Sequence, residues 1–219
     1  MKSNTYIGLT LLAFVLNGFV GCKSYETLEA ATKDWEKVDA VPIVAYKPVG
    51  DTKIDGLASP FVQQAIQLRK EVDLAYQDVR ASPSQKNLGT VAPENYQNAF
   101  NALPVAEQNK INDYLKSKAD ADATRLQTLL KQVTDLATAG LKLTLEIKDA
   151  AGGGAGGATD LANTMFKTAS GPGAAAAKQV NQAIEFCPVA EGMISNYEKS
   201  WTQVRAAVKR NTDKALSGK

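Results

Sequence analysis

Three glycines in the second half of the chain have the spacing of a nucleotide-binding loop. Gly152, Gly154 and Gly157 satisfy the pattern G-x-G-x-x-G. In a dinucleotide site this turn follows a buried parallel strand directly, so that amides at the start of the next helix meet the pyrophosphate. Here Lys142 and Glu146 make the preceding stretch polar, and residues 149–151 separate it from the glycines. We therefore interpret residues 151–158 as a Gly/Ala-rich loop between helices and predict no cofactor.

Two aspartates nearby resemble the first half of a calcium-binding loop. Asp120 and Asp122 have the spacing of its first and third ligands. However, Arg125 occupies the position that requires glycine, and Lys131 occupies the position of the bidentate glutamate. The pattern favours a solvated acidic helix face, so we predict no metal site.

Histidine is absent from the 219 residues. Its absence excludes Ser-His-Asp and Cys-His nucleophilic sites, histidine-ligated zinc and acid–base catalysis by histidine. Cys187 has no evident base partner, and we interpret it as a small buried apolar residue. We predict no catalytic residue and no enzyme activity. Catalysis by paired carboxylates stays open as an alternative, because glycan hydrolysis needs two acids and no histidine.

The N-terminal 22 residues have the organisation of a secretory signal. Lys2 supplies a positive charge, an apolar run follows over residues 7–20, and the run ends at Gly21 and Cys22. A cationic start, a short apolar helix and a small residue at the cleavage site are what such a signal requires. The run is shorter than the ~20 residues that cross a bilayer core. A cleaved signal is therefore favoured over an uncleaved anchor.

This stretch resembles the signal peptide of a bacterial lipoprotein. Residues 19–22 read Phe-Val-Gly-Cys, in which Gly21 and Cys22 match the family's motif and Phe19 departs from its usual aliphatic residue. The resemblance implies cleavage between Gly21 and Cys22, and lipidation of Cys22 with acyl chains such as palmitate. It also implies a membrane-anchored place in the bacterial cell envelope. Lys23, in place of aspartate, favours the outer membrane if the envelope has two.

Two alternatives to lipidation stay open at this point. The signal peptide is compatible with ordinary secretory cleavage at a site where cysteine stands by coincidence. If Cys22 escaped acylation, an oxidising compartment would also permit a disulfide between Cys22 and Cys187.

The composition is typical of a folded, weakly charged protein. Apolar residues make up 44% of the chain, which is enough for a core, and the formal net charge is +2. Removal of the signal peptide lowers that charge by the one unit of Lys2. So balanced a charge indicates neither nucleic acid nor an acidic surface as the partner.

The first half of the mature chain predicts helices separated by proline. Residues 25–38 have a helical apolar pattern, and Trp35 is expected to pack on the body of the domain. Residues 41–51 predict an extended connector. Ser59 and Pro60 predict the start of a long helix with a seam that ends near Ser82. A polar loop then leads to a short helix that begins at Pro93 and is broken by Pro104.

Residues 105–150 predict one nearly unbroken helix of roughly 70 Å. A three-four repeat gives the seam of a coiled-coil-like bundle, and a second apolar stripe beside it makes this helix our candidate for the centre of that bundle. The seam consists of Leu126, Leu129, Val133, Leu136, Gly140, Leu143, Ile147 and Ala150, and the second stripe of Leu130, Ala137, Leu141 and Leu145. Residues 141–148 also alternate like a strand, but their Leu, Lys and Glu content favours helix.

The last part of the chain predicts a turn and a final helix. Residues 151–173 form the turn, with a short helix over 160–169 inside it. The final helix starts at Ala174, and Pro188 predicts a break near Glu185. Tyr197 and Trp201 lie on its apolar face and are expected in the core. Arg205 and Lys209 are interpreted as a solvated basic pair.

These patterns together predict an all-α protein, an elongated bundle of long antiparallel helices with a Gly/Ala-rich interhelical loop. The expected organisation is a signal peptide (1–21), a tether with a short helix and a Pro-containing linker (22–57), a helical bundle (58–212) and a flexible tail (213–219). The tether would hold the domain off the bilayer.

The expected function is a structural or protein-interaction role in the envelope. The membrane is bound through the lipid, and the helices present a surface to a protein partner or to a second copy of the chain. Two alternatives stay open: membrane perturbation by residues 150–173, and an envelope enzyme that uses carboxylates alone.

Overall fold

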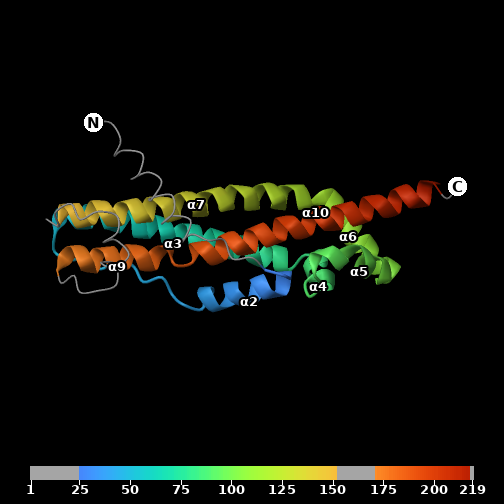
Figure 1. The fold of residues 1–219 in the computed structure, drawn as a ribbon, viewed down its shortest axis with the longest axis horizontal. Helices are drawn as coiled ribbons and strands as arrows, with labels where there is room; N and C mark the ends of the chain where they lie inside the picture. Colours follow the sequence, from blue (N-terminus) through green and yellow to red (C-terminus); the bar gives the residue numbers. More distant parts are fainter. Residues whose placement is uncertain (1–24, 152–170, 218–219) are drawn as a thin grey trace, which may run out of the picture. The chain divides into compact units, whose positions relative to one another are not determined.

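The computed structural model describes residues 25–151 and 171–217 (Figure 1). Over these residues the secondary structure is helical and contains no strand, so the all-α expectation is confirmed. The elements are α2 (Leu28–Asp39), α3 (Thr52–Arg80), α4 (Pro83–Leu88), η1 (Pro93–Asn95), α5 (Tyr96–Ala102), α6 (Val105–Ser117), α7 (Ala119–Ala150), α9 (Pro172–Ile184) and α10 (Cys187–Ser217). In the described part of the chain, no helix combines the length and apolar character that a membrane span requires.

The described residues fall into two compact units. Unit 1 contains residues 42–68, 134–151 and 171–188, and unit 2 contains residues 25–41, 69–133 and 189–217. Helices α3 and α7 contribute residues to both units.

Helix α2 confirms the short helix that the sequence predicts near the N-terminus. The Thr27 hydroxyl accepts a hydrogen bond from the amide of Ala30 at 3.1 Å, which caps its first turn. Leu28, Ala31 and Trp35 form its buried face. The predicted packing of Trp35 is confirmed, because this side chain has no exposed surface.

The predicted start of the long helix at Ser59 is wrong. Helix α3 begins at Thr52, where the Asp51 carboxylate accepts the amides of Lys53 and Ile54 at 3.0 and 3.1 Å. Pro60 lies inside the helix and leaves the carbonyl of Gly56 without its usual partner. Because Gly56 is exposed, water can satisfy this carbonyl. The acidic cap therefore fixes the start of α3.

The predicted seam of α3 is buried in both units, and the helix ends near Ser82 as expected. The polar loop expected after it is in part wrong. Ser82 caps α4 by accepting the amide of Gln85 at 3.2 Å, with Pro83 in the first turn. Pro93 opens η1, which leads into α5, and Pro104 separates α5 from α6, as predicted.

The single rod expected over residues 105–150 is wrong, because α6 ends at Ser117 and α7 starts at Ala119. Lys118 between them has φ −130° and ψ −30°, outside helical geometry. Neither Pro nor Gly marks this break. It accompanies the burial of Ile111 and Tyr114 in α6 and of Ala119 in α7. Tertiary packing therefore overrides a continuous local helix propensity here.

Helix α7 covers residues 141–148, which confirms helix over strand for that stretch. The predicted seam from Leu126 to Ile147 is buried. The second stripe is buried only at Ala137, whereas Leu130, Leu141 and Leu145 are partly exposed. Helix α7 is thus enclosed along one face, contrary to the central place we expected for it.

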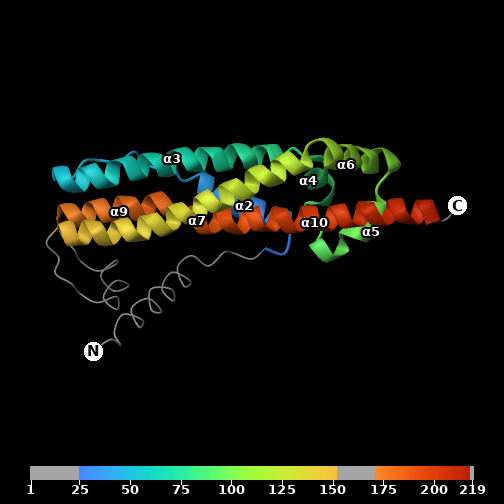
Figure 2. The ribbon, with the colours of Figure 1, turned by 90° about the horizontal axis from the view of Figure 1, so that it is seen from above.

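Gly140 allows α7 to pack closely on α3 and α9 in unit 1. A Cβ atom at this position would lie 2.9 Å from Ile184 of α9 and 2.9 Å from Phe61 of α3. At the other end of α9, a Cβ atom on Gly173 would lie 2.6 Å from Ala151. Both views show α9 beside the C-terminal half of α7 (Figures 1 and 2). Within unit 1 these contacts make α7 and α9 antiparallel.

The final helical region is divided as the sequence predicts. Helix α9 begins at Pro172, two residues before the expected start, after Gly171 with φ 127°. It ends at Ile184, and α10 begins at Cys187 with Pro188 in its first turn, so the predicted break near Glu185 is confirmed. Every residue from 189 to 197 except Ser195 is buried. Tyr197 and Trp201 lie in the core, as expected.

Candidate functional site

The polar groups of unit 2 gather where α2 meets α3 and α10. Trp35 of α2 packs on Tyr76 of α3 with ring centroids 6.4 Å apart and planes tilted by 53°. Its indole nitrogen donates to the carboxylate of Asp73 at 3.4 Å. An aromatic ring with a polar handle fits such a position, because one side chain fills the core and also satisfies a carboxylate.

Next to this contact, Glu36 of α2 interacts with Tyr76 and Arg80 of α3. The Glu36 carboxylate accepts a hydrogen bond from the Tyr76 hydroxyl at 3.1 Å and forms an ion pair with Arg80 at 2.7 Å, both through Oε1. Burial raises the pKa of Tyr76 to about 12; the Arg80 charge opposes this shift and the Glu36 charge adds to it. At neutral pH the hydroxyl is therefore protonated and acts as a donor, not as a base.

Helix α10 holds the other side of α2. The Thr32 and Tyr197 hydroxyls lie 3.3 Å apart, and the Asn196 amide donates to the main-chain carbonyl of Tyr25 at 2.7 Å. The carbonyl oxygen of the Asn196 side chain is buried without a hydrogen-bond partner. Burial, as the largest cause, raises the pKa of Tyr197.

Both ends of α2 are also bonded to other segments. The amide of Glu29 donates to the carbonyl of Gly89 at 2.8 Å, and Arg69 donates to the carbonyl of Val38 at 2.6 Å. We call this set of contacts the α2 clamp. It comprises Tyr25, Glu29, Thr32, Trp35, Glu36 and Val38 and their partners Arg69, Asp73, Tyr76, Arg80, Gly89, Asn196 and Tyr197.

A second cluster in unit 2 surrounds Tyr114. Its hydroxyl donates to the Asp122 carboxylate at 2.7 Å, and its ring lies 6.5 Å from that of Trp201, tilted by 58°. Lys118 approaches the same carboxylate at 3.8 Å. Burial and the Asp122 carboxylate raise the pKa of Tyr114, while a hydrogen bond with Ser82 lowers it.

This cluster corrects the interpretation of the aspartates and of the basic pair. Asp122 is buried at 8% exposure and serves Tyr114, so it is not part of a solvated acidic face. Asp120 is exposed but forms an ion pair with Arg205 of α10, which is therefore not a purely solvated cation. Both aspartates thus link helices. Within residues 25–151 and 171–217, no three His, Cys, Asp or Glu side chains gather in a way that could hold a metal ion.

In unit 1 the connector is held by Asp55. The carboxylate accepts the Tyr46 hydroxyl at 2.7 Å and the amides of Val49 and Gly50 at 2.8 and 3.2 Å. The hydrogen bond from the backbone amide of Val49 is the largest cause that lowers the pKa of Asp55, and the hydrogen bond from the Tyr46 hydroxyl is the next largest. Residues 42–49 have no regular secondary structure, as predicted.

The connector is also bonded to α9. The Gln179 side chain accepts the amide of Lys47 at 2.7 Å and donates to its carbonyl at 3.0 Å. These two bonds and the Asp55 contacts fix the course of residues 46–50 on α3 and α9.

Several residues singled out in the sequence lie outside the part of the chain that the structure describes. Gly21 and Cys22 lie outside the described residues, and so do Gly152, Gly154 and Gly157 and the short helix expected over 160–169. Cys187 is buried at the start of α10, as interpreted. Tyr197 was expected in the core, but the hydrogen bonds by which Tyr76, Tyr114 and Tyr197 join helices were missed. A tyrosine on an apolar helix face, such as Tyr76 beside Ala75, was the available signal, because its hydroxyl needs a partner when buried.

Comparison with known proteins adds no relative. The chain matches no protein-family model, no curated protein and no solved structure.

Proposed function

We propose that the protein is a lipid-anchored component of the bacterial cell envelope with a structural or protein-interaction role and no catalytic activity. The proposed architecture is an elongated bundle of long antiparallel helices joined by a Gly/Ala-rich loop. Cys22 is the proposed attachment site, with Gly21 preceding the cleaved bond. If the envelope has two membranes, Lys23 favours the outer one.

One observation supports this proposal above the others. Buried tyrosine hydroxyls whose pKa values are raised form hydrogen bonds that join helices. Tyr76 and Tyr197 link α2 to α3 and α10, and Tyr114 links α6 to α7. The Tyr76 and Tyr114 hydroxyls donate to carboxylates, and the Tyr197 hydroxyl shares a hydrogen bond with that of Thr32. Burial raises the pKa of all three hydroxyls, which are protonated at neutral pH. Polar contacts of this kind rigidify a core and favour one packing arrangement, which suits a structural role.

The surface offers defined positions at which to look for a partner. Val44 of the connector is 63% exposed and Val105 at the start of α6 is 71% exposed. Single exposed apolar residues are common on soluble proteins and do not by themselves indicate an interface. With Val41 and Leu74, they are the large apolar residues that the described part of the chain exposes, and a protein partner would remove their apolar surface from water.

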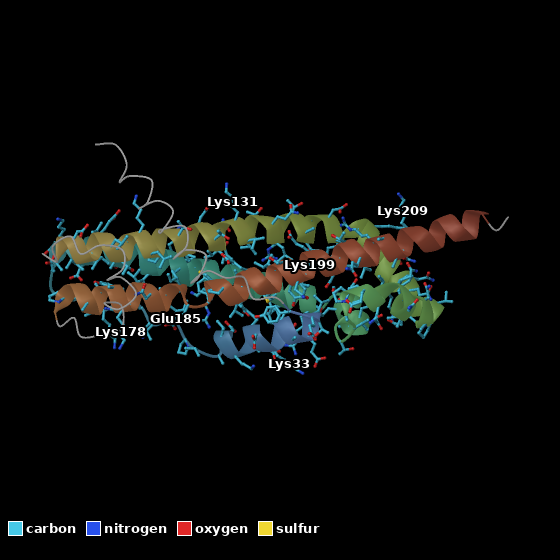
Figure 3. The ribbon with its side chains drawn as sticks, in the orientation of Figure 1. Lys33, Lys131, Lys178, Glu185, Lys199 and Lys209 are labelled. Carbon is cyan, nitrogen blue, oxygen red and sulfur yellow. The ribbon has the colours of Figure 1, made fainter. Side chains whose placement is uncertain are left out.

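Site-directed photo-crosslinking in intact cells tests the interaction role. A photoreactive residue replaces Val44 in unit 1 or Val105 in unit 2. The matched controls carry it at Lys178 of unit 1 or Lys131 of unit 2, which project from α9 and α7 (Figure 3). We expect adducts of defined mass from at least one apolar position and none from the controls. Adducts from no position at all would contradict the proposal.

The Cys22→Ala variant tests whether the anchor is part of the role. Without a lipid on residue 22 we expect the protein to leave the membrane fraction and the adducts to disappear. Their mass distinguishes a second copy of the chain from another protein.

A further inference from the structure

We infer that unit 2 is held against the headgroup layer of the membrane, at the end of α2 from which the chain continues to Cys22. The inference rests on the proposed lipidation of Cys22. It replaces the long tether over residues 22–57 with a spacer of residues 22–24.

The chain is already fixed to unit 2 at Tyr25, the first residue that the structure describes. The main-chain carbonyl of Tyr25 accepts the Asn196 amide at 2.7 Å, and the Tyr25 hydroxyl donates to Asp34 at 3.3 Å. Four residues later the amide of Glu29 is bonded to Gly89. The start of α2 is therefore fixed to both α10 and the segment after α4.

Helix α2 cannot extend as a tether without breaking the core. Leu28, Ala31 and Trp35 are exposed by 3%, 0% and 0%. Its release would expose these apolar side chains and break the α2 clamp, including the bonds of Thr32, Trp35 and Glu36. An arrangement in which residues 25–39 span the gap to a membrane is therefore strongly disfavoured.

The segment between Cys22 and Tyr25 can span only a short distance. Whatever their conformation, the residues from Cys22 to Tyr25 span at most about 11 Å at ~3.6 Å per residue. A flexible tether over residues 22–57 would instead have an average end-to-end distance of roughly 30 Å. The short spacer brings the surface around Tyr25 to the depth of the lipid headgroups.

The surface at this point belongs to α2 and α10. Lys199 lies on α10 one turn beyond Asn196 and is exposed (Figure 3). Glu26, next to Tyr25 in the chain, is exposed as well and carries the opposite charge. The occupant we assign is the phospholipid surface that holds the acyl chains of Cys22, because the length of chain demands it whatever the local charge.

Energy transfer to labelled lipids tests this placement in the lipidated full-length protein. A donor dye is attached to a Lys199→Cys variant, in which Cys187 is buried and protected from labelling. The protein is reconstituted into phosphatidylethanolamine/phosphatidylglycerol vesicles that carry a headgroup acceptor. The matched control has a flexible Gly/Ser insertion of about 15 residues between Ser24 and Tyr25, whose average span is roughly 20 Å.

We expect efficient energy transfer in the protein without the insertion. The insertion should lower the transfer efficiency by about twofold or more, because it lets unit 2 leave the membrane surface. Equal transfer in the two proteins, with helicity retained in both, would overturn the inference. Intact mass of the same samples keeps the two proposals distinguishable. Absence of the acyl chains contradicts the proposed function, whereas lipidated samples with equal transfer contradict only the placement.

Discussion

Single polar residues in the core of unit 2 act through hydrogen bonds whose partners differ in charge. Tyr114 donates to a carboxylate that is 8% exposed, whereas Tyr96 donates to the neutral hydroxyl of Ser200 at 3.0 Å. A buried charged acceptor that loses its donor costs more than a neutral one, because its desolvation is no longer compensated. The two tyrosines therefore provide a matched pair.

Tyr114→Phe is expected to lower the free energy of unfolding by about 1–3 kcal/mol, because it leaves Asp122 without its closest donor. Tyr96→Phe, the control, should cost about 1 kcal/mol or less. Urea denaturation followed by circular dichroism measures both. An equal loss in the two variants would contradict the role that we assign to the Asp122 carboxylate.

Replacing Gly140 by alanine should destabilise the protein, whereas the same change at an exposed helical glycine should stabilise it. In Gly140→Ala the new methyl group would meet Ile184 and Phe61 at 2.9 Å. Overpacking should outweigh the gain in helix propensity and give a net loss of about 1 kcal/mol.

Gly56→Ala in α3 is the control, because nothing lies within 4 Å of its added Cβ atom. This variant should be more stable than the native chain by up to about 1 kcal/mol. Thermal and urea unfolding of the two variants compare them directly. A stabilised Gly140→Ala protein would show that α7 does not need glycine at this contact.

Helix boundaries are set by caps and packing as much as by proline. The Asp51 carboxylate accepts hydrogen bonds from two backbone amides at the start of α3. Ser59 lies inside the helix, where the backbone amides are already bonded within the helix and need no cap. The pair Ser59-Pro60 has the usual sequence signature of a helix start, yet the helix passes through it. The carboxylate of Asp51 therefore carries the capping function.

Asp51→Ala should destabilise the protein by about 0.5–2 kcal/mol, as is usual for the loss of a helix cap. Ser59→Ala should be neutral within about 0.5 kcal/mol, since alanine suits a helix interior. Urea unfolding of both variants gives the comparison. If Ser59→Ala were the more damaging change, the start of α3 would have to be moved to that residue.

The sequence predicted the elements whose limits depend on local residues. Pro104 and Pro188 mark real breaks, and the seam of α7 follows the three-four repeat. The break at Lys118 was not predictable, because it has no local breaker and accompanies tertiary burial.

The interhelical polar links were missed for a related reason. Thr32 and Tyr197 are 165 residues apart, and Tyr96 and Ser200 are 104 apart, so no local pattern joins them. Cys22, the predicted site residue, depends on a local motif and was accessible to sequence reasoning, but the structure does not describe it.

At the scale of the whole molecule, the buried tyrosines make stability depend on alkaline pH. Burial raises the pKa of Tyr76 to about 12, and the pKa values of Tyr114 and Tyr197 are also raised from the usual value of about 10. Above pH ~10 the unfolded chain loses these protons while the folded chain keeps them. Their contribution to stability is thus complete below pH ~10 and is lost as the pH rises through the folded-state values.

We expect the melting temperature to fall steadily above pH ~10. The near-ultraviolet absorbance of tyrosinate should then rise together with the loss of helical circular dichroism. A pH titration that records both signals is the measurement. Ionisation of all the tyrosines near pH 10 with the helices intact would show that they are not held as described.

The whole molecule is most directly tested at its attachment point. We propose that the chain is delivered to the envelope and acylated at Cys22. Intact-mass and N-terminal peptide spectrometry of the protein from the membrane fraction measures this. We expect a protein that starts at Cys22 and carries several acyl chains. The Cys22→Ala variant should yield no acylated protein. An unacylated N-terminus, or a chain that retains Met1, would contradict it.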